Sequence, residues 1–229
     1  MGDLKSRIEG ISGEVSLEVV RRLEAGEAAD DIAKGLGFGA VDLVAAIARI
    51  ALGGEGSEGP GLVQATPAHP RLEKILDAES MGRLIPEAAR PARLALAAGL
   101  LQVFDFWDAS HTAAQEADDL GEHSTAAYWH MIAHRREPDA GNALYWARRV
   151  GRHPIFEALA GAARPILEAQ GDRSLADRLT PGGTWSPAAL IDLATRIRPG
   201  TPLEPLARSL QRLEMILLLE ASLSKVVGC

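Results

Sequence analysis

PARLALAAGLLQVFDFWDASHTAAQEADD, residues 91–119, is followed by the short segment LGEHS (120–124) and then by TAAYWHMIAHRRE (125–137). Apolar residues recur at three- and four-residue spacing in both long segments, which predicts helices over 91–119 and 125–137. Because the connection between them is only five residues long, the two helices should form an antiparallel hairpin.

The same helical spacing recurs along the rest of the chain, and alternation typical of a strand is not sustained anywhere. We therefore predict an all-α protein, a multi-helix bundle with a small three-helix module at its N-terminus. Pro165 should kink or split the helix that contains it. Besides the hairpin, the predicted helices are 17–24 (capped by Ser16), 27–36, 41–52, 71–77, 142–150, 154–169, 172–179, 187–197 and 202–225.

Residues 54–70 contain three prolines and four glycines and separate two helical regions. Such a composition is typical of a linker or a long loop. We accordingly divide the chain into an N-terminal module (1–56), a linker (57–70) and a larger helical domain (71–229).

Composition excludes several classes of protein. The single cysteine, Cys229, cannot form a disulfide within the chain, and no run of about 18 apolar residues predicts a membrane span. The net charge of −7 argues against nucleic-acid binding. With 20 arginines against 4 lysines, and with no signal peptide, we expect a bacterial, cytoplasmic protein.

Arginines and histidines are nevertheless concentrated in one stretch of the sequence. Residues 121–153 hold five arginines against three carboxylates, a local charge of +2, and five of the six histidines lie between His111 and His153. A ligand that binds here would meet a surface of opposite sign to the chain as a whole.

Three of these histidines are candidates for a metal site. His130 and His134 are four residues apart, so they share one face of their helix. If the hairpin turns near residues 121–122, His111 lies level with the interval between them. Two histidines one turn apart, with a third on the facing helix, can bind a divalent metal such as zinc, iron or manganese.

Neighbouring polar residues supply the remaining roles. Leu101, Phe104, Asp108, His111 and Gln115 follow one stripe of the predicted long helix. Glu137 or Asp108 would be the fourth ligand or the general base, and Gln115 would orient a ligand. A metal with an open position lowers the pKa of water toward about 7, which predicts metal-assisted hydrolysis or a related lyase step.

A second group of residues predicts an anion pocket beside the metal. Guanidinium groups match carboxylate or phosphate with two parallel hydrogen bonds, and Arg135, Arg136 and Arg149 are close in sequence to the histidines. Asn142 and Tyr145 would line the same pocket. The expected ligand is therefore a small anionic molecule.

The run YWHMIAHRREPD (128–139), followed by Asn142-Ala143 and Tyr145-Trp146, resembles a family of uncharacterised bacterial and fungal helical proteins. Ser110-His111 and the run GRHP (151–154) belong to the same resemblance, which covers about residues 104–156. It implies a family but no particular activity.

The N-terminal residues resemble a small helix-turn-helix unit of antitoxin-like proteins. The resemblance is carried by VVRRLEAGE (19–27), by DIA (31–33) and by the helix that follows. Residues 1–56 hold ten acidic against six basic side chains, so packing or dimerisation is a better expectation for them than DNA reading.

Two alternatives to the metal site remain open from the sequence. The histidines could form a metal-free polar pocket, or they could be neutral core groups bonded to carbonyls or to Gln115, with Asp108 paired to Arg135 or Arg136. In those cases the protein would be a non-enzymatic module that binds a small ligand or a protein. The sequence also leaves open whether the chain forms a homo-oligomer.

Overall fold

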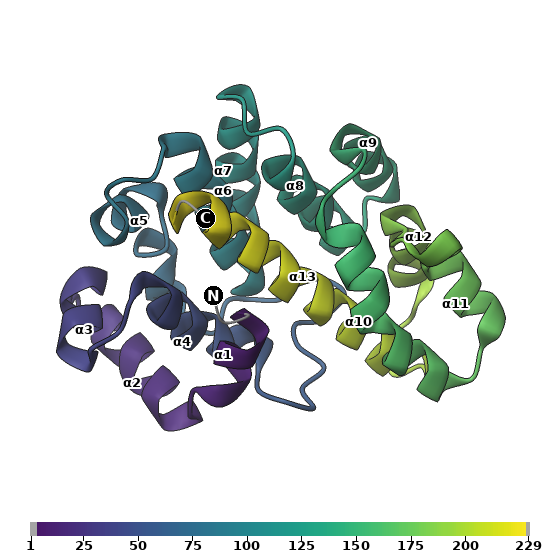
Figure 1. Ribbon diagram of the computed structural model, residues 1–229, viewed down its shortest axis with the longest axis horizontal. Helices are drawn as coiled ribbons and strands as arrows, with labels where there is room; N and C mark the ends of the chain where they lie inside the picture. The colour runs from purple at the N-terminus through teal and green to yellow at the C-terminus, as the bar shows by residue number, and fades with distance from the viewer. Residues whose placement is uncertain (1–3, 228–229) are drawn as a thin grey trace.

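The computed structural model describes residues 4–227, so Cys229 lies outside the described residues. Within that range the chain is 72% helical and contains thirteen α-helices and no strand, which confirms the predicted all-α class (Figure 1). The helices are α1 Leu4–Gly10, α2 Gly13–Glu24, α3 Ala29–Leu36, α4 Ala40–Leu52, α5 Ala78–Leu84, α6 Arg90–Val103, α7 Trp107–Asp119, α8 Thr125–Arg136, α9 Ala140–Val150, α10 Ile155–Gln170, α11 Arg173–Leu179, α12 Pro187–Arg196 and α13 Glu204–Val227.

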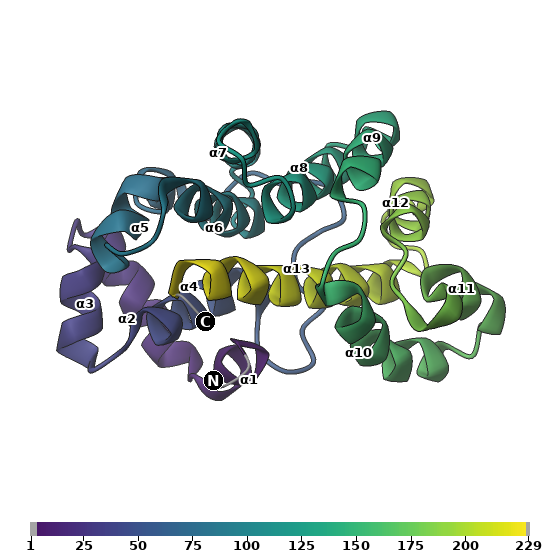
Figure 2. The same cartoon turned by 45° about the horizontal axis from the view of Figure 1, so that its top comes forward.

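The long C-terminal helix α13 is the centre of the bundle. It runs between a layer that contains α5, α6, α8 and α9 and a second group that contains α1, α4 and α10 (Figure 2). It contacts α1, α4, α6, α8, α10 and α12. Leucines and other apolar residues bury most of its circumference, as expected for a helix surrounded on several sides.

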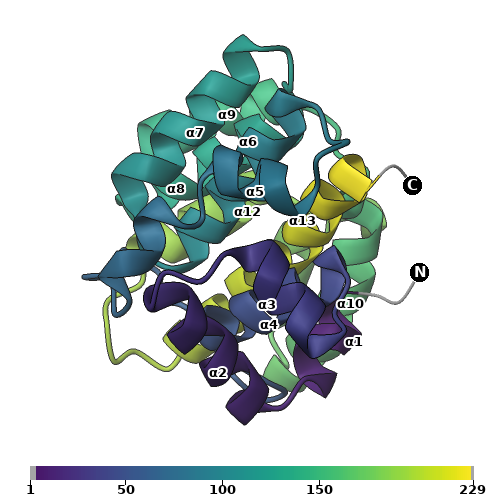
Figure 3. The same cartoon turned by 90° about the vertical axis from the view of Figure 1, so that its left-hand side faces the viewer.

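The N-terminal helices pack directly onto the rest of the bundle (Figure 3). Their apolar residues belong to the same hydrophobic core as α6, α8 and α13. Arg212 of α13 also reaches the end of α4, where its guanidinium donates to the carbonyl oxygens of Leu52, Gly53 and Gly54. These bonds satisfy carbonyls that a helix C-terminus leaves without partners.

The segment predicted as a linker is held against α8 and α13. The backbone nitrogen of Gln64 donates to the carbonyl of Arg136 at 3.0 Å, and the guanidinium of Arg208 donates to the carbonyl of Gly59 at 2.6 Å. Gly61 accepts from both Arg136 and Gln211 through its carbonyl oxygen. An irregular segment with this many long-range bonds is a structural part of the bundle.

The prediction of one helix over 91–119 was wrong. The structure has two helices, α6 and α7, separated at residues 104–106, where Asp105 adopts a positive φ of 67°. The guanidinium of Arg136 bonds to the carbonyl of Gln102 at 2.8 Å and to the Asp105 carboxylate at 2.6 Å, which stabilises the break. After it the chain folds back, and the Ser110 hydroxyl donates to the carbonyl of Ala98 on α6 at 2.8 Å.

Several smaller predictions also differ from the structure. Residues 71–77 do not form an α-helix: a 3-10 turn, Pro70–Lys74, precedes α5. Ser12, not Ser16, caps α2, and Ser16 is buried. Of the two outcomes expected at Pro165, a kink or a split, the split does not occur, since α10 continues from Ile155 to Gln170. No single described helix is long and apolar enough to cross a membrane, although α3 and α4, bent by 105° at their junction, reach that length and composition together.

Candidate metal centre

The hairpin of α7 and α8 brings three histidines together. The ring centroid of His111 lies 4.2 Å from that of His130 and 5.2 Å from that of His134, and the two α8 rings are 5.0 Å apart. His111 therefore lies level with the interval between the other two, at the height that the short connection implied.

The ring nitrogens of these histidines are close enough to share an ion. One ligand atom from each lies within 4.8 Å of the others. Nitrogens bound tetrahedrally to a single zinc ion at 2.0–2.1 Å stand about 3.3 Å apart, so small side-chain rotations would bring the three into coordination distance. The Nδ1 atom of His130 is buried and has no hydrogen-bond partner among the described residues, which leaves it able to donate its electron pair.

A carboxylate holds one of the rings in place. Nδ1 of His134 lies 2.9 Å from Oε2 of Glu137, one turn further along the chain. Because an ionised carboxylate only accepts hydrogen bonds, this contact places the proton on Nδ1 and leaves Nε2 with a free lone pair. Metal-ligating histidines commonly have such a partner.

Two indole rings pack against the cluster, one from α7 and one from α9. Trp107 of α7 stacks on His111 with ring centroids 4.9 Å apart, and Trp146 of α9 stacks on His130 at 3.8 Å. Trp107 is itself fixed by a 2.9 Å hydrogen bond from its indole nitrogen to the carbonyl of Ala133. The aromatic rings limit the orientations that the two imidazoles can adopt.

Burial keeps these imidazoles neutral. It lowers the pKa of His130 to about 3, and the neighbouring His111 and His134 act in the same direction. Burial also lowers the pKa of the half-buried His111. Metals bind neutral imidazole, so the lowered pKa values of His111 and His130 suit coordination.

Asp108, predicted as a ligand or general base, lies in a different place. It lines a groove on the face of α7 that turns toward α5 and α6, together with Leu101 and Thr112. Asp108 and His111 both belong to α7, three residues apart, but side chains at this spacing leave a helix about 60° apart. Asp108 lines the groove, whereas His111 contacts His130 of α8. The break at 104–106 removes Leu101 and Phe104 from the predicted stripe. Gln115 is also engaged elsewhere: its side-chain amide donates to Asp119 at 2.9 Å.

Two of the three arginines predicted for the anion pocket are buried in ion pairs within the fold. Arg135 and Arg136 have fully buried side chains. Their guanidinium groups lie 2.6 Å from the carboxylates of Glu214 and Asp105. A guanidinium buried in this way serves the packing of the bundle.

Arg149 is the one predicted anion ligand that reaches solvent beside the cluster. It pairs with the buried Asp118 of α7 at 2.5 Å, yet its side chain stays 40% exposed. Its guanidinium also lies 5.6 Å from the ring centre of Trp146, the indole that stacks on His130.

The other two predicted pocket residues lie on α9. The side-chain amide of Asn142 donates to Asp139, the residue that caps the helix. Tyr145 is 55% exposed and makes an edge contact with Trp146. Neither residue is directed at the histidines by a hydrogen bond.

Sequence reasoning missed the part played by the two tryptophans. Trp107 precedes His111 by four residues, a spacing that places both on one helix face, so this contact could have been predicted. Trp146 could not be placed in the same way, because α9 is a separate helix whose orientation toward α8 depends on tertiary packing.

A further group of possible ligand atoms adjoins the cluster. His134, Glu137 and Asp139 also have ligand atoms within 4.8 Å of one another, and Glu137 is partly exposed. The histidines therefore lie between a closed apolar side, formed by the helices, and a carboxylate side that reaches solvent. Comparison of the chain with family models, curated proteins and solved structures finds no match.

Proposed function

We propose that this protein binds one divalent transition metal, zinc, iron or manganese, through His111, His130 and His134. The observation that supports this most directly is the convergence of three imidazoles, from two helices, with ligand atoms within 4.8 Å of one another. Three converging imidazoles without an ion would be energetically unfavourable, because the burial of an unpaired polar nitrogen costs roughly 1–3 kcal/mol. Coordination of an ion would offset that cost for His130.

Glu137 is the positioning residue in this proposal. Its carboxylate accepts from Nδ1 of His134 and so leaves Nε2 of the same ring free to bind the ion. Since this bond already uses one oxygen, a role for Glu137 as general base would depend on its second oxygen, on the side of the site that reaches solvent. Asp108, which lies in another groove, has no part in the site.

The activity that fits such a centre is metal-assisted hydrolysis or a related lyase step. A divalent ion with three protein ligands supplies Lewis acidity and lowers the pKa of water. Arg149, half-exposed beside Trp146, is the residue best placed to attract a small anionic substrate. The arginine-rich, lysine-poor composition supports a bacterial source for this protein.

One observation favours a non-enzymatic role instead. Trp146 stacks on His130 at 3.8 Å and Trp107 stacks on His111 at 4.9 Å, contacts that a purely structural histidine would also make. In that case the hairpin would be an aromatic core without metal, and the protein would act as a binding module. The two functions differ in whether the protein takes up an ion.

Metal analysis of the protein purified without an affinity tag tests the proposal. We expect close to one equivalent of metal after incubation with zinc, iron or manganese, and a rise in melting temperature, because an ion bound only by the folded state stabilises it. His130→Gln and His134→Gln should each abolish uptake while leaving the far-ultraviolet circular dichroism unchanged.

His123→Gln is the matched control. His123 lies in the turn of the same hairpin, is exposed, and its Nδ1 atom lies 3.1 Å from the carboxylate of Asp118. This variant should retain full uptake. Less than about 0.1 equivalent in the unmodified protein, with no melting shift for any of the three metals, would contradict the metal site and favour the binding module.

A further inference from the structure

A groove lies on the face of α7 that turns toward α5 and α6, where Asp108 and Thr112 line it. It has a volume of about 610 Å³ and lies between the 3-10 turn and α5 on one side and α6 and α7 on the other. Its floor is apolar and consists of Leu94, Ala97, Leu101, Ala109 and Ala113. A pocket of this size falls in the range that small molecules occupy.

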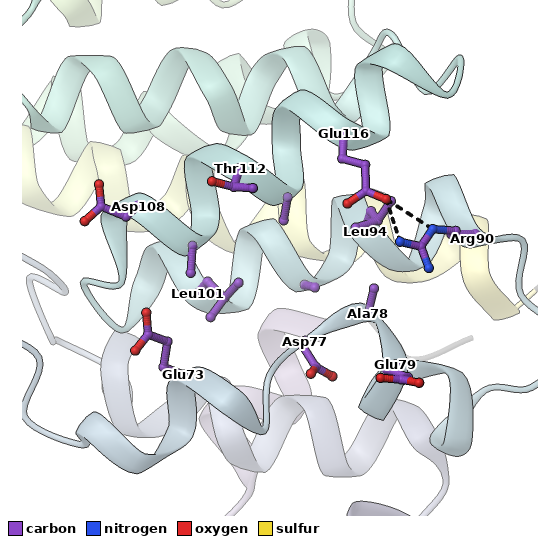
Figure 4. Close-up of a pocket in the computed structure, with 13 residues that line it drawn as sticks. Glu73, Asp77, Ala78, Glu79, Arg90, Leu94, Leu101, Asp108, Thr112 and Glu116 are labelled. Carbon is purple, nitrogen blue, oxygen red and sulfur yellow. Dashed lines mark hydrogen bonds and ion pairs between the residues drawn. The ribbon is translucent and has the colours of Figure 1, made fainter.

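Carboxylates surround this apolar floor. Figure 4 shows Asp108 and Glu73 at one end, near Leu101, while Asp77 and Glu79 lie toward the other end. Glu116 also lines that end, where Arg90 pairs with it at 2.5 Å. The lining thus holds five carboxylates against one guanidinium.

Three of these carboxylates, Glu73, Glu79 and Asp108, have no ion-pair or hydrogen-bond partner among the described residues. Arg90 attracts Glu79 electrostatically but forms no ion pair with it. Arg90, the one cation that lines the groove, is already engaged by Glu116. Like charges gathered around an apolar hollow repel one another, and a bound cation would relieve that repulsion.

The spacing of the carboxylates indicates the shape of such a cation. Asp108 and Glu116 are eight residues apart on α7, which corresponds to about 12 Å along a helix. Among the described residues, the only clusters compact enough to hold a metal ion contain His134, and no carboxylate of the groove belongs to them. Charges this far apart suit an extended organic cation better than a single inorganic ion.

We propose that the groove binds a linear aliphatic polyammonium compound. Its methylene segments would cover Leu94, Ala97 and Leu101, and its terminal ammonium groups would pair with Asp108 and Glu73 at one end and with Asp77 and Glu79 at the other. Apolar contact and charge complementarity then act on alternate parts of one ligand. This site is separate from the proposed metal centre and does not depend on it.

The layout of the groove favours a linear ligand with charge at both ends. Carboxylates lie toward the two ends of the groove, and the apolar side chain of Leu101 and the alanines lie between them. A chain of methylene groups that carries terminal ammonium groups matches this order of charged and apolar surface.

Isothermal titration calorimetry of the full chain, in metal-free buffer, tests the proposal with spermidine as the probe. We expect one site per chain, with affinity that falls as salt concentration rises. The neutral compound 1,8-octanediol should not bind, and magnesium chloride at the same concentration should not displace spermidine.

Two variants act on the groove through different properties. The double variant Glu73→Gln/Asp108→Asn removes charge at one end and should weaken spermidine at least 10-fold. Ala109→Met leaves the charge unchanged and fills the floor, and it should weaken binding by a similar factor. Glu168→Gln, an exposed carboxylate on α10, is the matched control and should bind as the unmodified chain does.

Three results would overturn the proposal. Unchanged affinity in both groove variants would show that spermidine responds only to the general negative charge. Displacement by equimolar magnesium would show an inorganic cation site. The third result is a basic amphipathic peptide that binds more tightly than spermidine and equally well to the Ala109→Met variant. That result would show that the acidic rim docks a protein segment.

Discussion

Glu137 holds the imidazole of His134: its Oε2 atom lies 2.9 Å from Nδ1, and the two residues are three apart at the end of α8. His134 is nearly buried, whereas the Glu137 side chain is 38% exposed. An exposed carboxylate contributes little to the free energy of folding. Substitution of Glu137 should therefore change the affinity for metal and leave the stability of the bundle nearly unchanged.

Glu137→Ala should raise the dissociation constant for metal by about 10- to 100-fold, the usual effect of losing a carboxylate that orients a ligating histidine. Glu137→Gln should have a smaller effect, because its carbonyl oxygen can still accept from Nδ1. Competition with a chromophoric chelator measures both constants. Glu116→Gln, which alters an exposed carboxylate on α7, is the control, and equal affinity in all four proteins would refute the orienting role.

The stability of the metal-free protein should depend on pH through two buried histidines. Burial lowers the pKa of His130 to about 3 and that of His153 to about 4, and Lys225 lowers the latter further. In the unfolded chain the pKa of each histidine should be about 6.5. Between these values the unfolded state binds more protons, so the free energy of unfolding falls as pH falls below about 6.5.

The expected slope is roughly 1.4 kcal/mol per pH unit for each histidine, and the free energy should be nearly constant with respect to these groups above pH 7. Urea unfolding at pH 7, 6 and 5 in the presence of a chelator measures it. His130→Gln and His153→Gln should each flatten the dependence by about one proton, and His123→Gln should leave it unchanged. Parallel curves for all four proteins would show that the two buried histidines do not control it.

The sequence was sufficient for the parts of the structure that depend on local spacing. Helical periodicity predicted the all-α class, and a five-residue connection predicted that His111 would lie level with His130 and His134. Both predictions follow from geometry within or between adjacent helices, where separation along the chain limits separation in space.

The parts that depend on distant partners could not be predicted in this way. The break that separates Leu101 on α6 from His111 on α7 is held by Arg136, 31 residues beyond Asp105. Similarly, Arg135 has the local pattern of a surface cation, and only the position of Glu214 on α13 accounts for its burial. A run of charged residues gives no sign of a partner that tertiary packing provides.

The pairing of Arg135 with Glu214 leads to a prediction about stability. Their side chains are fully buried and 2.6 Å apart, and Glu214 also accepts from the Tyr128 hydroxyl and the Trp185 indole. Glu214→Gln keeps those two acceptor contacts but leaves Arg135 as an uncompensated buried charge. We expect the free energy of unfolding to fall by about 3–5 kcal/mol.

A double-mutant cycle separates the pair from its surroundings. Arg135→Met should be similarly destabilising alone, whereas Arg135→Met/Glu214→Gln should lose less than the sum of the single variants, because neither charge is then left without its partner. Urea unfolding gives all three values. Additive effects within about 0.5 kcal/mol would contradict a direct interaction.

A close contact between α6 and α8 in the core leads to a prediction about glycine. A Cβ added at Gly99 of α6 would lie 2.6 Å from the Cε2 and Cζ2 atoms of Trp129 on α8 and 2.9 Å from Leu219 on α13. Alanine favours a helix over glycine by up to about 1 kcal/mol, but overpacking of a core costs about 1–3 kcal/mol. Gly99→Ala should therefore lower the melting temperature.

Gly161 of α10 provides the matched control for this substitution. It also lies inside a helix, but it is exposed, and a Cβ there would meet nothing within 4 Å. Gly161→Ala should raise the free energy of unfolding by about 0.4–1 kcal/mol, so the same change of residue has opposite signs at the two positions. If both variants were stabilised, α6 and α8 would have to be able to move apart at Trp129 without loss of packing.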